Sequence, residues 1–273
     1  MKESTLPSKV FRFKDIVLKE KHVRDFHQVV GWEIGDDYLH PCYLHSVAFP
    51  LHMMLLLEPD FPFPLLGLVH INNQITQIRP MRVGERLSVN SHFGHLEIHP
   101  KGWLFSINVA FHIEAEVVWK SESTNLFLCK HEPQVESFVQ QPSDISSWDI
   151  KSNWQLKGNL GRRYAKVSGD FNPIHVSKWT AKLFGFKQHI IHGMWTKSYC
   201  LSELQKVNST IFNQGFVANI AFKQPLYLPN QVQMLTGNCD SERVSDTSNF
   251  KVLGSEPVKG QQALHLVGNI RSI

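Results

Sequence analysis

Residues 193–207 read GMWTKSYCLSELQKV, and this stretch decides the fold class. Its apolar residues Met194, Leu201 and Leu204 recur at roughly helical spacing, which predicts a helix that starts at Gly193. Strand-like runs separated by turn residues follow at Phe216–Phe222, Gln231–Gly237, Ser248–Leu253 and Ala263–Ile270. One buried helix followed by antiparallel strands indicates an α+β fold, with a curved sheet wrapped around the helix.

The first half of the chain has the same order of elements. It predicts a helix near Tyr43–Leu57, followed by strands near Leu68–Ile78, Arg86–Phe93, Leu104–Glu114 and Asn125–Lys130. In the second half, short helices near Leu160–Val167 and Ser177–Phe184 precede the longer helix.

Two weak internal similarities support a duplication. Arg24–Gly31 resembles Arg162–Gly169, and Ile75–Val83 resembles Ile220–Leu228 in the same order. Residues 132–145 are rich in Gln, Ser, Glu and Pro, which is typical of a linker. We therefore expect two similar units, 1–131 and 146–273, whose sheets pair side by side.

Composition excludes several classes of protein. The 273 residues carry 28 Lys+Arg against 24 Asp+Glu, a net charge of +4 that is too mild to predict nucleic-acid binding. The most apolar stretch, residues 53–69, is interrupted by acidic residues and prolines, so we expect no membrane span. We expect no signal peptide from residues 1–23, which lack an apolar run, and the four cysteines are scattered; together these features predict a cytoplasmic protein.

Fifteen histidines raise the question of a metal site. The pairs His45/His52 and His95/His99 lack a third ligand at a recognisable spacing, so we expect no metal. No dinucleotide fingerprint follows a strand, and we expect no cofactor.

The turn Gly169–His175, GDFNPIH, carries the most chemistry. A carboxylate at Asp170 and an imidazole at His175, on a turn stiffened by Pro173, can hold and polarise one water molecule. The same residues also suit a purely structural role, in which Asp170 and Asn172 make Asx turns and His175 caps the next helix. Both interpretations stay open on spacing alone.

The second chemical element is IIHGM at residues 190–194. A glycine where a helix begins lets a ligand approach unpaired backbone N–H groups, which favours an oxyanion hole for a thioester carbonyl. Tight backbone packing at Gly193 explains the glycine equally well. Gly158–Gly161 before Arg162 is a weaker candidate for phosphate contact, and a solvated helix start explains it better.

Together these residues form a longer pattern, Tyr164-Ala165-x-x-Ser168-Gly169-Asp170-x-Asn172-Pro173-x-His175, followed by His192-Gly193-Met194. The pattern resembles the hydratase-2 signature of the MaoC-like dehydratases over about 35 residues. The resemblance implies a double hotdog fold and reversible hydration of trans-2-enoyl-CoA to (R)-3-hydroxyacyl-CoA.

The resemblance also implies roles for individual residues. Asp170 and His175 become the catalytic pair, and Asn172 supports them. The backbone N–H of Gly193 becomes the oxyanion donor. Phe171, His192 and Met194 are then expected to contact the acyl-CoA or acyl carrier protein thioester, with a homodimer as a further possibility.

The first unit departs from this signature. Trp32 stands where the repeat places Asp170, and Asp36, Asp37 and His40 lie nearby in another order. We therefore expect a non-catalytic unit that completes the fold and walls part of the substrate tunnel. The apolar loop Phe61–Leu66 is a candidate wall, or else an ordinary buried connector.

Three alternatives to an enoyl-CoA hydratase remain at this point. The first is a 3-hydroxyacyl-ACP dehydratase with the same site. The second is a non-catalytic subunit that binds acyl thioesters, against which the intact Asp170/Asn172/His175 set argues. The third is a hotdog thioesterase, which would release a free thiol.

Overall fold

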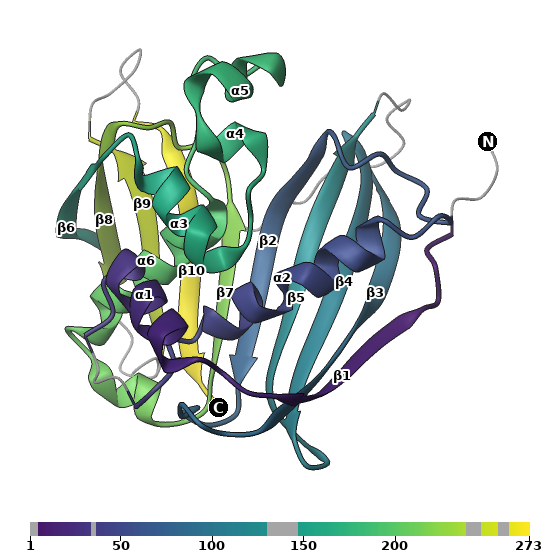
Figure 1. Ribbon diagram of the computed structural model, residues 1–273. Helices are drawn as coiled ribbons and strands as arrows, with labels where there is room; N and C mark the ends of the chain where they lie inside the picture. Colours follow the sequence, from purple (N-terminus) through teal and green to yellow (C-terminus); the bar gives the residue numbers. More distant parts are fainter. Residues whose placement is uncertain (1–4, 34–36, 130–146, 239–246, 256–261) are drawn as a thin grey trace.

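A computed structural model describes residues 5–33, 37–129, 147–238, 247–255 and 262–273 (Figure 1). The expected linker, 132–145, and Asp36 lie outside these residues. The strands are β1 (Val10–Ile16), β2 (Leu68–Gln77), β3 (Leu87–His99), β4 (Gly102–Ile113), β5 (Glu116–Leu128), β6 (Ser147–Leu156), β7 (Phe216–Phe222), β8 (Asn230–Asn238), β9 (Thr247–Gly254) and β10 (Leu264–Ser272). The helices are α1 (Glu20–Val30), α2 (Tyr43–Leu56), α3 (Leu160–Ser168), α4 (Pro173–Val176), α5 (Lys178–Leu183) and α6 (Gly193–Gln205), with a 3-10 turn at Ser209–Asn213.

All ten strands form one antiparallel sheet in the order β1-β3-β4-β5-β2-β7-β10-β9-β8-β6. The two halves of the chain meet where β2 pairs with β7, from Asn72 opposite Ala221 to Gln77 opposite Phe216. The expected side-by-side pairing of two sheets is therefore confirmed. Pairing at this position removes one exposed strand edge from each half.

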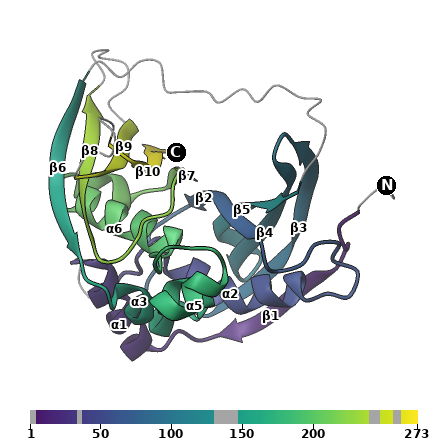
Figure 2. The same ribbon diagram turned by 90° about the horizontal axis from the view of Figure 1, so that it is seen from above.

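Each half wraps its five strands around a helix, α2 in the first and α6 in the second (Figures 1 and 2). Helix α6 is buried on nearly every side, including its polar residues Thr196, Ser198 and Ser202. A helix buried all round normally has an apolar sequence, so these polar side chains need partners inside the fold. Ser198 and Ser202 find them by donating to carbonyl oxygens one turn earlier on the helix.

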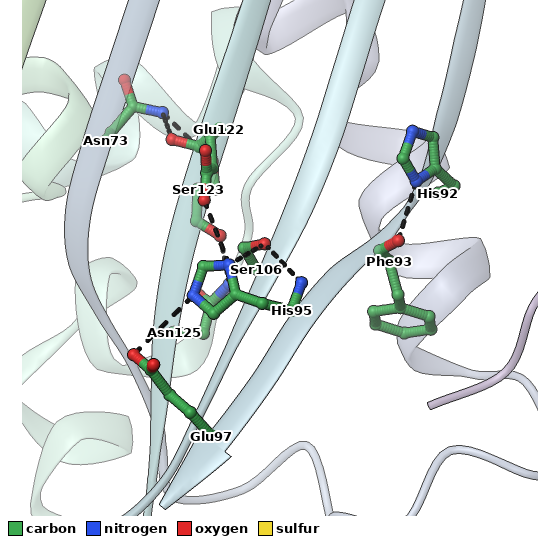
Figure 3. A network of polar contacts seen from close by, with 9 residues as sticks. All are labelled: Asn73, His92, Phe93, His95, Glu97, Ser106, Glu122, Ser123 and Asn125. Carbon is green, nitrogen blue, oxygen red and sulfur yellow. Dashed lines mark hydrogen bonds and ion pairs between the residues drawn. The ribbon is translucent and has the colours of Figure 1, made fainter. Parts of the chain in front are cut away.

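A buried lysine links the two halves at this junction. Lys197 on α6 donates from Nζ to the Asn73 carbonyl oxygen at 2.9 Å, to Asn73 Oδ1 at 2.5 Å and to the Ala218 carbonyl oxygen at 3.2 Å. Asn73 lies on β2 and Ala218 on β7, and Asn73 Nδ2 in turn donates to Ser123 Oγ on β5 (Figure 3). Burial lowers the pKa of Lys197 to about 7.

The strand boundaries expected for the first half were partly wrong. Strand β5 begins at Glu116 rather than near Asn125, and β3 continues to His99 instead of ending at Phe93. In the segment Lys120–Asn125 the buried positions are the small polar residues Ser121 and Ser123, so no apolar alternation marks this part of the strand. Strands β1 and β6 were not predicted; both are edge strands with mostly exposed residues, so no apolar alternation marks them.

Candidate active site

The turn between α3 and α4 is held by its own side chains. Gly169 ends α3 with φ +77°, a left-handed conformation that favours glycine. Asp170 Oδ1 accepts from the Asn172 N–H at 3.1 Å, and Asn172 Oδ1 accepts from the Ile174 N–H at 3.3 Å. The Asx-turn interpretation is thus correct for both residues. It does not exclude chemistry, because the same turn holds the Asp170 carboxyl group beside two histidines.

His175 lies on α4 and is buried, with 8% of its surface exposed. Its Nδ1 lies 2.8 Å from the Ile190 carbonyl oxygen. A carbonyl oxygen only accepts, so Nδ1 carries the proton and Nε2 presents a lone pair. Burial lowers the pKa of His175, although the nearby Asp170 carboxylate and the bond to Ile190 act in the opposite direction. A neutral imidazole with a free Nε2 is suited to accept a proton.

His192, which precedes α6, completes a compact group with Asp170 and His175. Its Nε2 donates to the Asp170 carbonyl oxygen at 2.9 Å and lies 3.8 Å from Asp170 Oδ2. Its ring stacks on that of His175, with centroids 3.7 Å apart. Burial, with His175 as a second contribution, lowers the pKa of His192 well below its usual value. The Asp170 side chain is 26% exposed, so water reaches this group from one side.

These three residues could also be considered as metal ligands. They are the one group of His, Cys, Asp and Glu, within the parts of the chain that are described, whose ligand atoms lie within 4.8 Å of one another. One nitrogen of each histidine is already bonded to a backbone carbonyl. What remains for an ion is His175 Nε2, His192 Nδ1 and the carboxylate, a set that suits zinc in type. The chemistry of the donors therefore permits both a metal and a proton-transfer site.

Gly193 begins α6, so its N–H is one of those without a partner within the helix. A side chain at this position would meet the Phe222 ring, since a Cβ would lie 2.9 Å from two of its carbons. Gly193 therefore combines the two features expected from the sequence: close packing of its backbone and a backbone N–H that is available to a ligand. Of the expected neighbours, Met194 is 6% exposed and packs in the core, whereas Phe171 is 60% exposed.

A second glycine fixes the position of His175. A Cβ at Gly161 on α3 would overlap the carbonyl oxygen of His175, so α3 and α4 pack in backbone contact. This packing gives Gly161 a structural reason that the sequence did not suggest. The neighbouring Arg162 donates to the Val176 carbonyl oxygen at 3.3 Å, on the same pair of helices.

In the first half, the corresponding residues are part of the core. Trp32 is 8% exposed and packs edge-to-face against His40, which is fully buried. Tyr38 forms an isolated β-bridge with Arg82, and Ile190 forms the equivalent bridge with Tyr227 in the second half. His40 follows Tyr38 by two residues, as His192 follows Ile190, so His40 and His192 occupy equivalent positions. The Nε2 atom of His40 lies 3.1 Å from the Ser198 carbonyl oxygen. Sequence reasoning missed this correspondence, because the paired residues Tyr38 and Ile190 from which it is counted are recognised only in the structure.

Histidines that lie far apart in the sequence come together in the fold. His70 on β2 lies next to His45 and His52 of α2. His95 contacts Ser106, Glu97 and Glu122, and its side chain is 44% exposed (Figure 3).

Comparison with known proteins identifies the second half. Residues 152–256 match the family model for the MaoC like domain, which includes the whole Asp170–Gly193 site. The C-terminal half is similar to MaoC-like dehydratase domains, which indicates an enzyme of the hydro-lyase class.

Two comparisons cover most of the chain. The chain is 29% identical over 237 residues to 3-hydroxyacyl-thioester dehydratase X of Mycobacterium tuberculosis, covering 82% of this chain and 78% of the relative. The crystal structure of HtdX from the same organism superposes with a TM-score of 0.77 at 24% identity, covering 97% of this chain and 100% of that one.

A further Mycobacterium tuberculosis protein, described as having a double hotdog fold, superposes with a TM-score of 0.64 at 9% identity, covering 97% and 96% of the two chains. The fold is a double hotdog, as expected from the sequence. None of the helices in the described ranges is long and apolar enough to cross a membrane.

Proposed function

We propose that this protein catalyses the reversible hydration of trans-2-enoyl-CoA to (R)-3-hydroxyacyl-CoA. The observation that carries the proposal is the Nδ1-protonated His175 grouped with the Asp170 carboxyl group and with His192 at the start of α6, within the segment that matches the MaoC like domain. The matching relative, a 3-hydroxyacyl-thioester dehydratase, supports chemistry on an acyl thioester.

The proposed reaction adds one water molecule across the C2–C3 double bond. Asp170 and His175 Nε2 hold the water, its oxygen attacks C3, and its proton passes to the pair. A proton from the pair then reaches C2, so the protein returns to its starting state. The Gly193 N–H donates to the thioester oxygen, where negative charge develops, and stabilises the transition state more than the ground state. Asn172 keeps the turn in place by capping α4.

Other parts of the proposal follow from the same assignment. We propose that Phe171, His192 and Met194 contact the substrate, that the unit 1–131 is non-catalytic, and that the unit 146–273 holds one active site per chain. We also propose a cytoplasmic homodimer. Sedimentation analysis tests the dimer, and cell fractionation tests the compartment.

The decisive experiment follows the loss of enoyl-thioester absorbance with crotonyl-CoA and longer enoyl-CoAs, with chiral analysis of the product. We expect (R)-3-hydroxyacyl-CoA without an added metal or nucleotide. A parallel arm with enoyl-ACP distinguishes a dehydratase that uses acyl carrier protein. Release of free thiol would indicate a thioesterase, and activity that depends strictly on a divalent ion would favour the metal interpretation of Asp170, His175 and His192.

A further inference from the structure

Three histidines gather in the first half of the molecule, away from the catalytic pair. His45 and His52 of α2 have ring centroids 5.1 Å apart, and the His70 ring on β2 stacks against His45 at 6.1 Å. His45 and His52 are each 7% exposed. The proposed reaction uses none of them, so their burial has another reason.

Each of the three rings has a buried nitrogen without a protein partner: His45 Nδ1, His52 Nε2 and His70 Nε2. A buried polar atom left unpaired costs about 1–3 kcal/mol, so three in one place are expensive. Buried side chains that lack partners in the free protein are commonly satisfied by a bound molecule or by water.

The rings are uncharged at neutral pH. Burial is the main cause, lowering the pKa of His52 to about 4 and that of His70 to about 3, and it also lowers the pKa of His45 well below its usual value. Lys197 lies close enough to contribute to the low values of His45 and His70, with its ammonium already bonded to Asn73 and Ala218. A neutral imidazole offers one donor and one acceptor, which suits a hydroxyl group better than a carboxylate.

The cluster is connected to the active site through one residue. The His70 ring lies 5.1 Å from the ring of Phe222 at the end of β7. The same Phe222 ring lies against Gly193, where the proposed oxyanion donor begins α6. The Phe222 ring therefore contacts both Gly193 and His70, which places the histidine cluster one side chain away from the proposed oxyanion donor.

We propose that His45, His52 and His70 form a polar subsite for the far end of the acyl chain, and that the preferred substrate carries a neutral hydrogen-bonding group there, such as a hydroxyl. This inference rests on the proposed function, because it assumes that an acyl thioester is held at Gly193. A metal does not fit this cluster, since the ligand atoms of these three histidines are not all within 4.8 Å of one another.

The test compares trans-2-enoyl-CoAs of increasing length that end either in a methyl or in a hydroxyl group. At the length that reaches the cluster, we expect kcat/KM to be at least about tenfold higher for the hydroxylated chain, because a site with unpaired polar groups rejects the analogue that lacks a partner. In His52→Leu this preference should disappear, while turnover of crotonyl-CoA, which carries no terminal hydroxyl, should persist. His95→Leu, an exposed histidine of the same half, is the matched control and should keep the preference.

Equal or better use of the plain chains by the wild-type protein at every length would overturn the inference, as would a preference that survives in His52→Leu. If His52→Leu does not fold, the comparison of methyl-ended and hydroxyl-ended chains with the wild-type protein still tests the inference. If no enoyl-CoA is hydrated, crotonyl-CoA included, the proposed function fails separately. Calorimetric binding of saturated acyl-CoAs with and without the terminal hydroxyl then tests the subsite, and equal affinity would refute it.

Discussion

The imidazole of His192 stacks on that of His175, with ring centroids 3.7 Å apart and planes inclined by 29°. The two rings are anchored through opposite nitrogens, His175 by Nδ1 to Ile190 and His192 by Nε2 to Asp170. Burial is the main cause that lowers the pKa of both rings, and for His192 the neighbouring His175 adds to it. The stack holds the two rings together, while the bond to Ile190 sets which nitrogen His175 presents. This favours a positioning role for His192 in addition to the substrate contact proposed for it.

Removing either member of the catalytic pair should abolish most activity. Asp170→Asn and His175→Ala are each expected to lower kcat by about 10²–10⁴, the range for a positioned acid or base. The double variant should be little worse than either single one, because the two groups act as a unit. Steady-state kinetics with crotonyl-CoA measures this. Asp37→Ala, in the first half, is the matched control and should keep near-normal kcat; a large loss there would show that the first unit is catalytic.

The pH dependence of activity should reflect His175. Its pKa is lowered by burial, so the base stays neutral as pH falls to 6.5 and below, and activity is lost only when pH falls through the lowered value. We expect the acid limb of the kcat/KM profile to lie below pH 6.5, the ordinary value. An acid limb above that value, or an unchanged limb in the residual activity of His175→Ala, would contradict the assignment.

Buried histidines should make the fold sensitive to acid. In the unfolded chain His52 binds a proton near pH 6.5, whereas in the folded protein its pKa is about 4. Its contribution to stability is therefore present above pH 6.5 and is lost as pH falls toward 4, at up to about 1.4 kcal/mol per pH unit for one proton. Urea unfolding of the wild-type protein and His52→Leu between pH 7.5 and 5 measures the difference. His52→Leu should show a shallower decline with falling pH than the wild-type protein.

Lys197 should matter for the junction of the two halves. In Lys197→Met the Asn73 and Ala218 oxygens lose their buried donor, which should cost about 2–4 kcal/mol of unfolding free energy. Lys206→Met is the control, because Lys206 is 35% exposed and its ion pairs with Glu33 and Glu203 should contribute less than about 1 kcal/mol. Chemical denaturation compares the two. Equal stability losses would show that the buried lysine is not needed at the junction.

Gly161 should be needed for the position of His175. In Gly161→Ala the new Cβ would overlap the His175 carbonyl oxygen, so α4 must shift, at a cost of about 1–3 kcal/mol and with reduced kcat. Gly158→Ala is the matched control, since its Cβ would meet only Pro229, at 3.8 Å. Melting temperature and kcat are measured for both variants. A fully active Gly161→Ala would show that α4 tolerates the displacement.

The sequence by itself determined the class of the fold and the candidate site. The apolar spacing after Gly193 predicted the central helix, because burial imposes a helical period on the sequence. The turn from Gly169 to His175 was recognisable because left-handed backbone, Asx turns and a proline demand particular residues at fixed spacing. Local chemistry of this kind is visible in a single sequence.

Only the tertiary structure decided which distant residues meet. Lys197 and Asn73 bond across the junction, His70 joins His45 and His52, and no local pattern marks either arrangement. The protonated nitrogen of His175 is likewise set by Ile190, a residue of another segment. Strand pairing brings together residues that are far apart in the chain and buries them. Burial then determines which titratable side chains are neutral and which polar atoms lack a hydrogen-bond partner. Such effects depend on three-dimensional neighbours, and they are absent from the order of the residues alone.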